Sequence, residues 1–291
     1  MGVANAGQLG LIGLLVTGCA DVAPASVASQ LFISDYRANA IFRYDGDSGG
    51  FLGVFAEGSE QRVDRPAGVR FGPRDQLYAA GFGRGEIVRY DVHSGAMMDV
   101  FYWDTALLEE PVELAFHGDE LVVLGNDTQN IVVLAPDGRA MRSFGYPIMQ
   151  GAHDFAFGGA DRVYVATDTA IQIWNLATGT QLGQLGTPDQ LARATSVAVD
   201  RDETIFVADW ERGRVVRYAA DGSWLGILAD GFVGPIAIEL GLDGALYVLD
   251  RTGVVRLDAA DGDNRSQLVA GDQLVSPRGF TFVSDALLGL E

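Results

Sequence analysis

Residues 205–222, IFVADWERGRVVRYAADG, decide the fold expected for this chain. The stretch opens with an apolar run, passes through a polar segment that ends at Gly213, and continues with the β-branched pair Val215 and Val216. Runs of β-branched and aromatic residues bounded by Gly, Asp and Ser are typical of β-strands. The stretch therefore predicts two strands joined by a turn.

The same two-strand pattern occurs six times, with starts on average 43 residues apart, at Leu31, Leu77, Leu121, Val163, Ile205 and Leu246. A further short strand is predicted before each copy after the first, and one more follows the last copy: residues 66–71, 111–116, 151–157, 193–199, 234–240 and 276–282. An apolar segment such as residues 51–55 or 224–228 follows each copy. Each repeat thus contains four predicted strands.

Four-stranded repeats at this spacing are the signature of a β-propeller, and no helical periodicity runs long enough to compete. The fold class expected is all-β, a six-bladed β-propeller with four-stranded antiparallel blades. The first copy lacks its inner strand, whereas residues 278–282 form an inner strand without a blade. Docking this C-terminal strand on blade 1 would close the ring and remove an exposed sheet edge. The propeller is predicted to span residues 31–283, with a tail at 284–291.

The inner-strand pattern P-x-G-hydrophobic, followed by an LYVAD-like strand and I-x-R-Y-D, resembles NHL repeats, over about residues 30–283. The SMP-30/gluconolactonase propellers look similar in fold. That resemblance implies an alternative function as a metal-dependent hydrolase or lyase, with a divalent cation held where the chain enters the inner strands. The repeat register places six residues at these entries: Ala67, Val112, His153, Thr195, Ile236 and Arg278. Only His153 among them carries a metal-ligating side chain, and no Asn-Gly or Asp-Gly occurs there. We therefore expect no cofactor and keep a divalent cation as the alternative.

Residues 46–50, GDSGG, match the run around the nucleophilic serine of trypsin-like proteases. The repeat gives another interpretation, because Ser48 aligns with Ser94, Thr178 and Asp261, each followed by Gly. A short polar side chain followed by Gly is typical of a hairpin turn. We therefore predict a turn and assign no catalytic residue.

The chain is acidic, with 39 Asp and Glu against 20 basic residues and a net charge of -19. This balance opposes a nucleic-acid partner, because phosphate contacts need Lys and Arg. Near the N-terminus, residues 9–16 (LGLIGLLV) form an apolar run too short to span a bilayer, and VTGC at 16–19 resembles a bacterial lipobox. A buried cysteine or a spanning helix is the alternative. We expect a signal peptide at 1–18, lipidation of Cys19 and a tether at 19–30, which would anchor the protein to a membrane of the bacterial cell envelope, periplasmic or surface-exposed.

In propellers, the loops that lead into the inner strands meet the loops between second and third strands around the mouth of the central channel. Ligands favour such concavities, although the fold does not say what is bound. The residues predicted at this mouth are Glu113, His153, Asp154, Asp209, Trp210, Arg212, Arg278, Asp35 and Tyr36. His153, Asp154 and Glu113 would ligate a metal or act as acid and base, or they would line a wet channel and satisfy one another.

The aromatic and charged residues of the predicted rim favour a protein, peptide or glycan ligand. Residues 97–111 form the largest insertion, and Tyr102 and Trp103 within it are candidates for a partner surface or for the outer strand of blade 2. The function expected is a lipid-anchored binding or scaffolding module that acts through the channel mouth. The alternatives are the hydrolase or lyase and an accessory subunit of an envelope complex.

Overall fold

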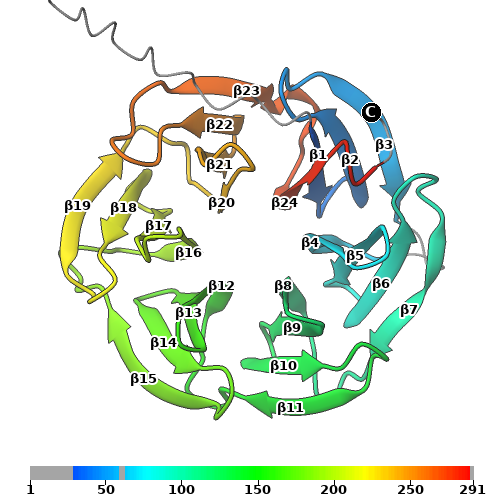
Figure 1. The fold of residues 1–291 in the computed structure, drawn as a ribbon, viewed down its shortest axis with the longest axis horizontal. Helices are drawn as coiled ribbons and strands as arrows, with labels where there is room; N and C mark the ends of the chain where they lie inside the picture. Colours follow the sequence, from blue (N-terminus) through cyan, green and yellow to red (C-terminus); the bar gives the residue numbers. More distant parts are fainter. Residues whose placement is uncertain (1–28, 59–62, 289–291) are drawn as a thin grey trace, which may run out of the picture.

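A computed structural model describes residues 29–58 and 63–288, which form six four-stranded antiparallel sheets arranged as blades around a central channel (Figure 1). The inner strands line the channel: β24 (Pro277–Ser284), β4 (Pro66–Gly72), β8 (Pro111–His117), β12 (Ala152–Gly158), β16 (Ala194–Val199) and β20 (Ala237–Leu240). The second strands are β1 (Ser29–Asp35), β5 (Gln76–Gly81), β9 (Glu120–Gly125), β13 (Arg162–Thr167), β17 (Ile205–Asp209) and β21 (Leu246–Asp250).

The third strands are β2 (Ala40–Asp45), β6 (Glu86–Asp91), β10 (Asn130–Leu134), β14 (Ile171–Asn175), β18 (Arg214–Tyr218) and β22 (Gly253–Leu257). The outer strands are β3 (Phe51–Glu57), β7 (Met97–Trp103), β11 (Ala140–Phe144), β15 (Thr180–Leu185), β19 (Trp224–Ala229) and β23 (Ser266–Ala270). A 3-10 turn, η1 (Gly271–Gln273), follows the last outer strand. No helix of the described segments is long and apolar enough to cross a membrane.

The predicted closure of the ring is confirmed, because β24 pairs antiparallel with β1 and completes blade 1 (Figure 1, red beside blue). The register joins Ser29 to Ser284 and Ile33 to Phe280. Both strands run slightly further than expected, since β1 begins at Ser29 inside the predicted tether and β24 ends at Ser284. The expected signal peptide and Cys19 lie outside the described residues.

The core consists of apolar layers between neighbouring blades. Phe32 of blade 1 packs in one cluster with Leu77 and Tyr90 of blade 2, and Phe206 of blade 5 packs with Val248 of blade 6. Second strands are buried on both faces, which explains why they read as unbroken apolar runs rather than alternating ones. The inner strands approach so closely that a Cβ on Gly68 would lie 2.8 Å from the Glu113 Cα. Glycine in the P-x-G pattern is therefore a packing requirement.

The GDSGG run is the exposed turn between β2 and β3, as predicted. The Asp45 carboxylate accepts hydrogen bonds from the Ser48 backbone N–H and hydroxyl, both at 2.7 Å. Asp91 holds Ser94 in the same way in blade 2, and Asn175 holds Thr178 in blade 4. The hydroxyl of Ser48 is thus a turn-stabilising group on the face opposite the channel mouth.

The insertion at residues 97–111 contributes the outer strand of blade 2, which is one of the two arrangements anticipated. Tyr102 is only 9% exposed and belongs to the core between blades 2 and 3, whereas Trp103 is 68% exposed at the end of β7. Only Trp103 of this pair is accessible, and its role as a partner contact stays a prediction.

Candidate functional site at the channel mouth

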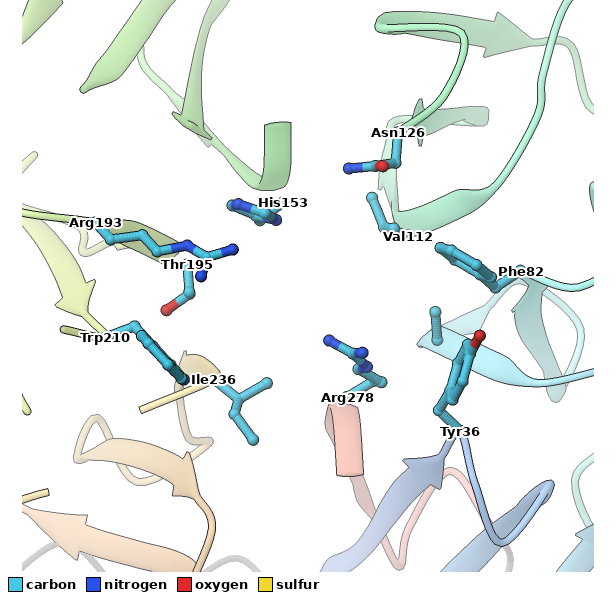
Figure 2. Close-up of a pocket in the computed structure, with 11 residues that line it drawn as sticks. Tyr36, Phe82, Val112, Asn126, His153, Arg193, Thr195, Trp210, Ile236 and Arg278 are labelled. Atoms are coloured by element: carbon cyan, nitrogen blue, oxygen red, sulfur yellow. The ribbon is translucent and has the colours of Figure 1, made fainter. Parts of the chain in front are cut away.

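A cavity of about 360 Å³ opens where the loops leading into the inner strands meet the loops between second and third strands (Figure 2). Its lining residues are Tyr36, Ala67, Phe82, Val112, Asn126, His153, Arg193, Thr195, Trp210, Ile236 and Arg278. One residue of every blade lies at the start of its inner strand in this lining: Ala67, Val112, His153, Thr195, Ile236 and Arg278. The repeat register therefore placed this ring correctly.

A second ring of lining side chains is fixed by backbone hydrogen bonds. The residue that follows each second strand donates its N–H to a carbonyl of the loop leading into the inner strand of the same blade. Tyr36 donates to Ser276 at 3.0 Å, Asn126 to Glu110 at 3.0 Å and Trp210 to Arg193 at 2.9 Å. Because the backbone sets this position, the side chain there is free to differ between blades.

Aromatic rings and arginines stack in pairs around the rim. Tyr36 and Phe82 meet edge to face with ring centroids 5.3 Å apart, and the Arg278 guanidinium lies 5.3 Å from the Tyr36 centroid. On another blade, the Arg193 guanidinium lies 5.2 Å from the centroid of Trp210. Guanidinium groups stacked on aromatic faces keep their in-plane N–H donors available.

His153 and Arg193 share one carboxylate. The Nε2–H of His153 donates to Asp168 Oδ1 at 2.9 Å, and Arg193 Nε donates to the same oxygen at 3.1 Å. Partial burial works to raise the pKa of Asp168, but the hydrogen bond from His153 and the charge of Arg193 lower it below its usual value. Asp168 is therefore ionised at neutral pH, and it orients the imidazole with Nδ1 as the remaining acceptor.

Below the cavity, three carboxyl groups surround one arginine in the channel. Arg70 lies 2.5 Å from Glu239 and 3.3 Å from Glu113 Oε1. The charge of Asp154 also acts on the pKa values of Arg70 and Glu113. Glu113 is 8% exposed, and its Oε1 accepts no hydrogen bond within the described residues. Burial raises the pKa of Glu113 to about 8 and also raises the pKa values of Asp154 and Glu239. Burial works to lower the pKa of Arg70, but the charges of Glu239 and Glu113 outweigh burial and raise that pKa.

The structure separates the residues predicted to cluster as metal ligands. Asp154 accepts hydrogen bonds from the Ser196 hydroxyl and the Val197 N–H of the next blade, whereas His153 points to the cavity and pairs with Asp168. Throughout residues 29–58 and 63–288, no three His, Cys, Asp or Glu side chains are arranged to hold a metal ion. Glu113 and Asp154 occupy the buried ring below the mouth, not the mouth itself.

Asp35 and Asp209 also differ from expectation, since each is buried with 0% exposure. Asp35 accepts the N–H groups of Val275 and Ser276, which fixes the loop that leads into β24. Asp209 does the same for the loop before β16 and pairs with Arg214 at 3.0 Å.

Arg212 lies outside the cavity lining and donates to the Pro188 carbonyl at 2.7 Å. Among the predicted mouth residues, only Tyr36, His153, Trp210 and Arg278 line the cavity.

Sequence reasoning missed two polar residues of the lining, Asn126 and Arg193. Asn126 occupies the position after the second strand that Tyr36, Phe82 and Trp210 hold in other blades, so strict use of the repeat register would have found it. Arg193 directly precedes its inner strand β16, and it is held at the cavity by its stacking on Trp210 and its hydrogen bond to Asp168, two tertiary contacts.

No protein-family model matches this chain, and no curated protein matches it. Solved structures do resemble it. A chain of the nidogen/laminin complex has a TM-score of 0.72 at 15% identity, covering 87% of this chain and 98% of that one. A streptogramin B lyase has a TM-score of 0.59 at 14% identity, covering 84% and 75%. The virginiamycin B lyase from Staphylococcus aureus has a TM-score of 0.66 at 12% identity, covering 89% of each. These likenesses define the class as a six-bladed β-propeller.

Proposed function

We propose that this chain is a binding propeller, which holds a small molecule, or the end of a peptide or glycan, in the channel-mouth cavity. The observation that carries the proposal is the cavity lining. Three aromatic rings stand on the rim, and Ala67, Val112 and Ile236 give apolar surface at the starts of the inner strands. A concave, mostly apolar site with a few convergent polar groups is the usual form of a ligand pocket. The nidogen/laminin complex illustrates binding by a chain of this fold.

The Trp210→Ala variant tests the proposal. Trp210 is 38% exposed on the rim, and the loss of its ring should weaken any ligand that rests in the cavity at least tenfold, on the order of 1.4 kcal/mol or more. A library of aromatic fragments, monitored by ligand-observed NMR, gives the ligands for the measurement. Trp103→Ala is the matched control, because Trp103 is an exposed tryptophan of an outer strand. Equal binding by both variants would reject the cavity as the site.

We further propose that the propeller is lipid-anchored in the cell envelope through Cys19. The support is the apolar run at 9–16 and the lipobox-like VTGC at 16–19. Mass spectrometry of protein isolated from the membrane fraction should find the N-terminus at Cys19 with a diacylglycerol-sized addition. An unmodified Cys19 preceded by residues 1–18 would reject the anchor.

The His153–Asp168 pair favours a second candidate function, a lyase. Eliminations need a general base, and a histidine held by a carboxylate supplies one whose Nδ1 can accept a proton. Two of the similar structures are named as lyases of streptogramin B and virginiamycin B. Elimination from virginiamycin B catalysed by this protein, and its loss in His153→Asn, would establish the candidate; unchanged virginiamycin B after prolonged incubation would remove it.

A further inference from the structure

We infer that the ligand of the channel-mouth cavity carries a carboxylate beside a flat apolar body, and that Arg278 and Arg193 hold the carboxylate. The inference rests on the proposed binding function and names the class of ligand for the same cavity. It covers a free aromatic acid and the C-terminal carboxylate of a peptide that ends in an aromatic residue, since both present the same chemistry.

The charge of the lining is the first observation. The chain has 39 acidic and 20 basic residues, so acidic side chains outnumber basic ones about two to one over the whole sequence. Yet the eleven lining residues include two arginines and no Asp or Glu. Asp168 pairs with His153 beside the cavity. Asp35 and Asp209, the chain neighbours of the lining residues Tyr36 and Trp210, are buried and accept backbone N–H groups. The mouth is thus a cationic spot on an acidic protein, which attracts an anion.

The hydrogen-bond donors of Arg278 are the second observation. Within the described parts of the chain, its guanidinium forms no ion pair and donates no hydrogen bond, and its one defined contact is the face of Tyr36. Figure 2 shows this guanidinium pointing into the cavity above β24. A stacked guanidinium presents a rigid fork of N–H groups at its edge, and that fork matches a carboxylate in two parallel hydrogen bonds.

Arg193 supplies the second cation from blade 5. Its guanidinium stacks on Trp210 and, within the described residues, donates a hydrogen bond only through Nε, to Asp168. Its terminal nitrogens face the cavity, as Figure 2 shows. The ionised Asp168 offsets part of the charge of Arg193. The two guanidinium groups together therefore present less than two net positive charges to the cavity. A monoanionic carboxylate suits this balance better than a doubly charged phosphate.

The apolar part of the ligand follows from the remaining walls. Phe82 and Trp210 come from blades 2 and 5 and lie on opposite sides of the cavity in Figure 2, with Ile236 and Val112 between them. A planar ring placed between these walls would contact aromatic faces while its carboxylate reached Arg278. The volume of about 360 Å³ fits a ligand of one or two rings.

The experiment compares acids with their uncharged amides by isothermal titration calorimetry on the full propeller. The probes are 3-phenylpropanoate and 3-phenylpropanamide, together with the peptide acetyl-Ala-Ala-Phe with a free or an amidated C-terminus. We expect each acid that binds to bind at least about tenfold tighter than its amide, as charge-assisted hydrogen bonds require. Arg278→Gln should remove this preference, while Arg139→Gln, on the opposite face, should keep it.

The outcomes separate the inference from the proposed function. Equal affinity for acid and amide, with both lost in Trp210→Ala, would overturn the carboxylate and leave the binding site in place. Binding that is unchanged in Trp210→Ala and Arg278→Gln would reject the site itself. An acid preference shown by 3-phenylpropanoate but not by the peptide would identify a small-molecule ligand. An acid preference shown by the peptide would identify a C-terminus, and either result supports the inference. An acid preference that survives in Arg278→Gln would overturn the role of Arg278.

Discussion

A chain that ends at Ser276 should fail to fold as a monomer. The truncation removes β24, which carries the buried Phe280 and Val283, and it leaves the edge of β1 unpaired beside the channel. Each buried apolar side chain contributes about 1.5–3 kcal/mol, and the lost strand pairing adds to this, against a total stability of about 5–15 kcal/mol. Size-exclusion chromatography and circular dichroism should show aggregated or unfolded protein, because an open sheet edge recruits other chains.

A rearranged chain provides the control for this truncation. Ser284 is the register partner of Ser29, so residues 277–284 placed before Ser29 through a short turn can form the same antiparallel pair. This variant should recover a monomeric β-sheet protein. Recovery would show that the strand itself closes the ring, whereas a folded, monomeric 1–276 chain would refute the closure.

Arg70→Met should give the largest loss of stability among single substitutions in the channel. It leaves the buried Glu113 and Asp154 and the half-buried Glu239 without their cation, and removing one partner of a buried ion pair costs about 3–5 kcal/mol. Arg89→Met is the control, since its partner Asp99 is 45% exposed and a solvent-exposed pair should contribute about 0–1 kcal/mol. Urea denaturation at pH 7 measures both variants.

The loss of stability caused by Arg70→Met should be larger at high pH than at low pH. The pKa of Glu113 is raised in the folded protein to about 8 from an ordinary value of 4.5, so the folded state binds more protons than the unfolded state between these values. The free energy of unfolding therefore falls as pH rises through this window. Removal of Arg70 steepens the fall, because it raises the pKa values of the remaining carboxyl groups further. The variant should be more stable at pH 5 than at pH 8, and Glu239→Gln in the same chain should restore part of the loss. Equal stability at both values would contradict a carboxyl cluster that depends on Arg70.

The repeat alone determined the architecture and the ring of positions around the mouth. Strand signals recur with one register, so the alignment of Ala67, Val112, His153, Thr195, Ile236 and Arg278 followed from local pattern, and all six line the cavity. The unpaired inner strand at the C-terminus likewise predicted closure on blade 1. Such features depend on residues close in sequence or on the period itself, and sequence carries both directly.

Tertiary structure alone decided which charged residues face the ligand and which are buried. Asp209 and Trp210 are neighbours in sequence, yet the carboxylate turns inward to backbone N–H groups while the indole stands on the rim. Arg70 meets Glu239 from 169 residues away, a contact that exists only once the ring has closed. The physical reason is that a carboxylate is placed by whichever donors surround it in three dimensions. A repeat pattern fixes where a residue stands on its blade but not which donors the neighbouring blades bring to it.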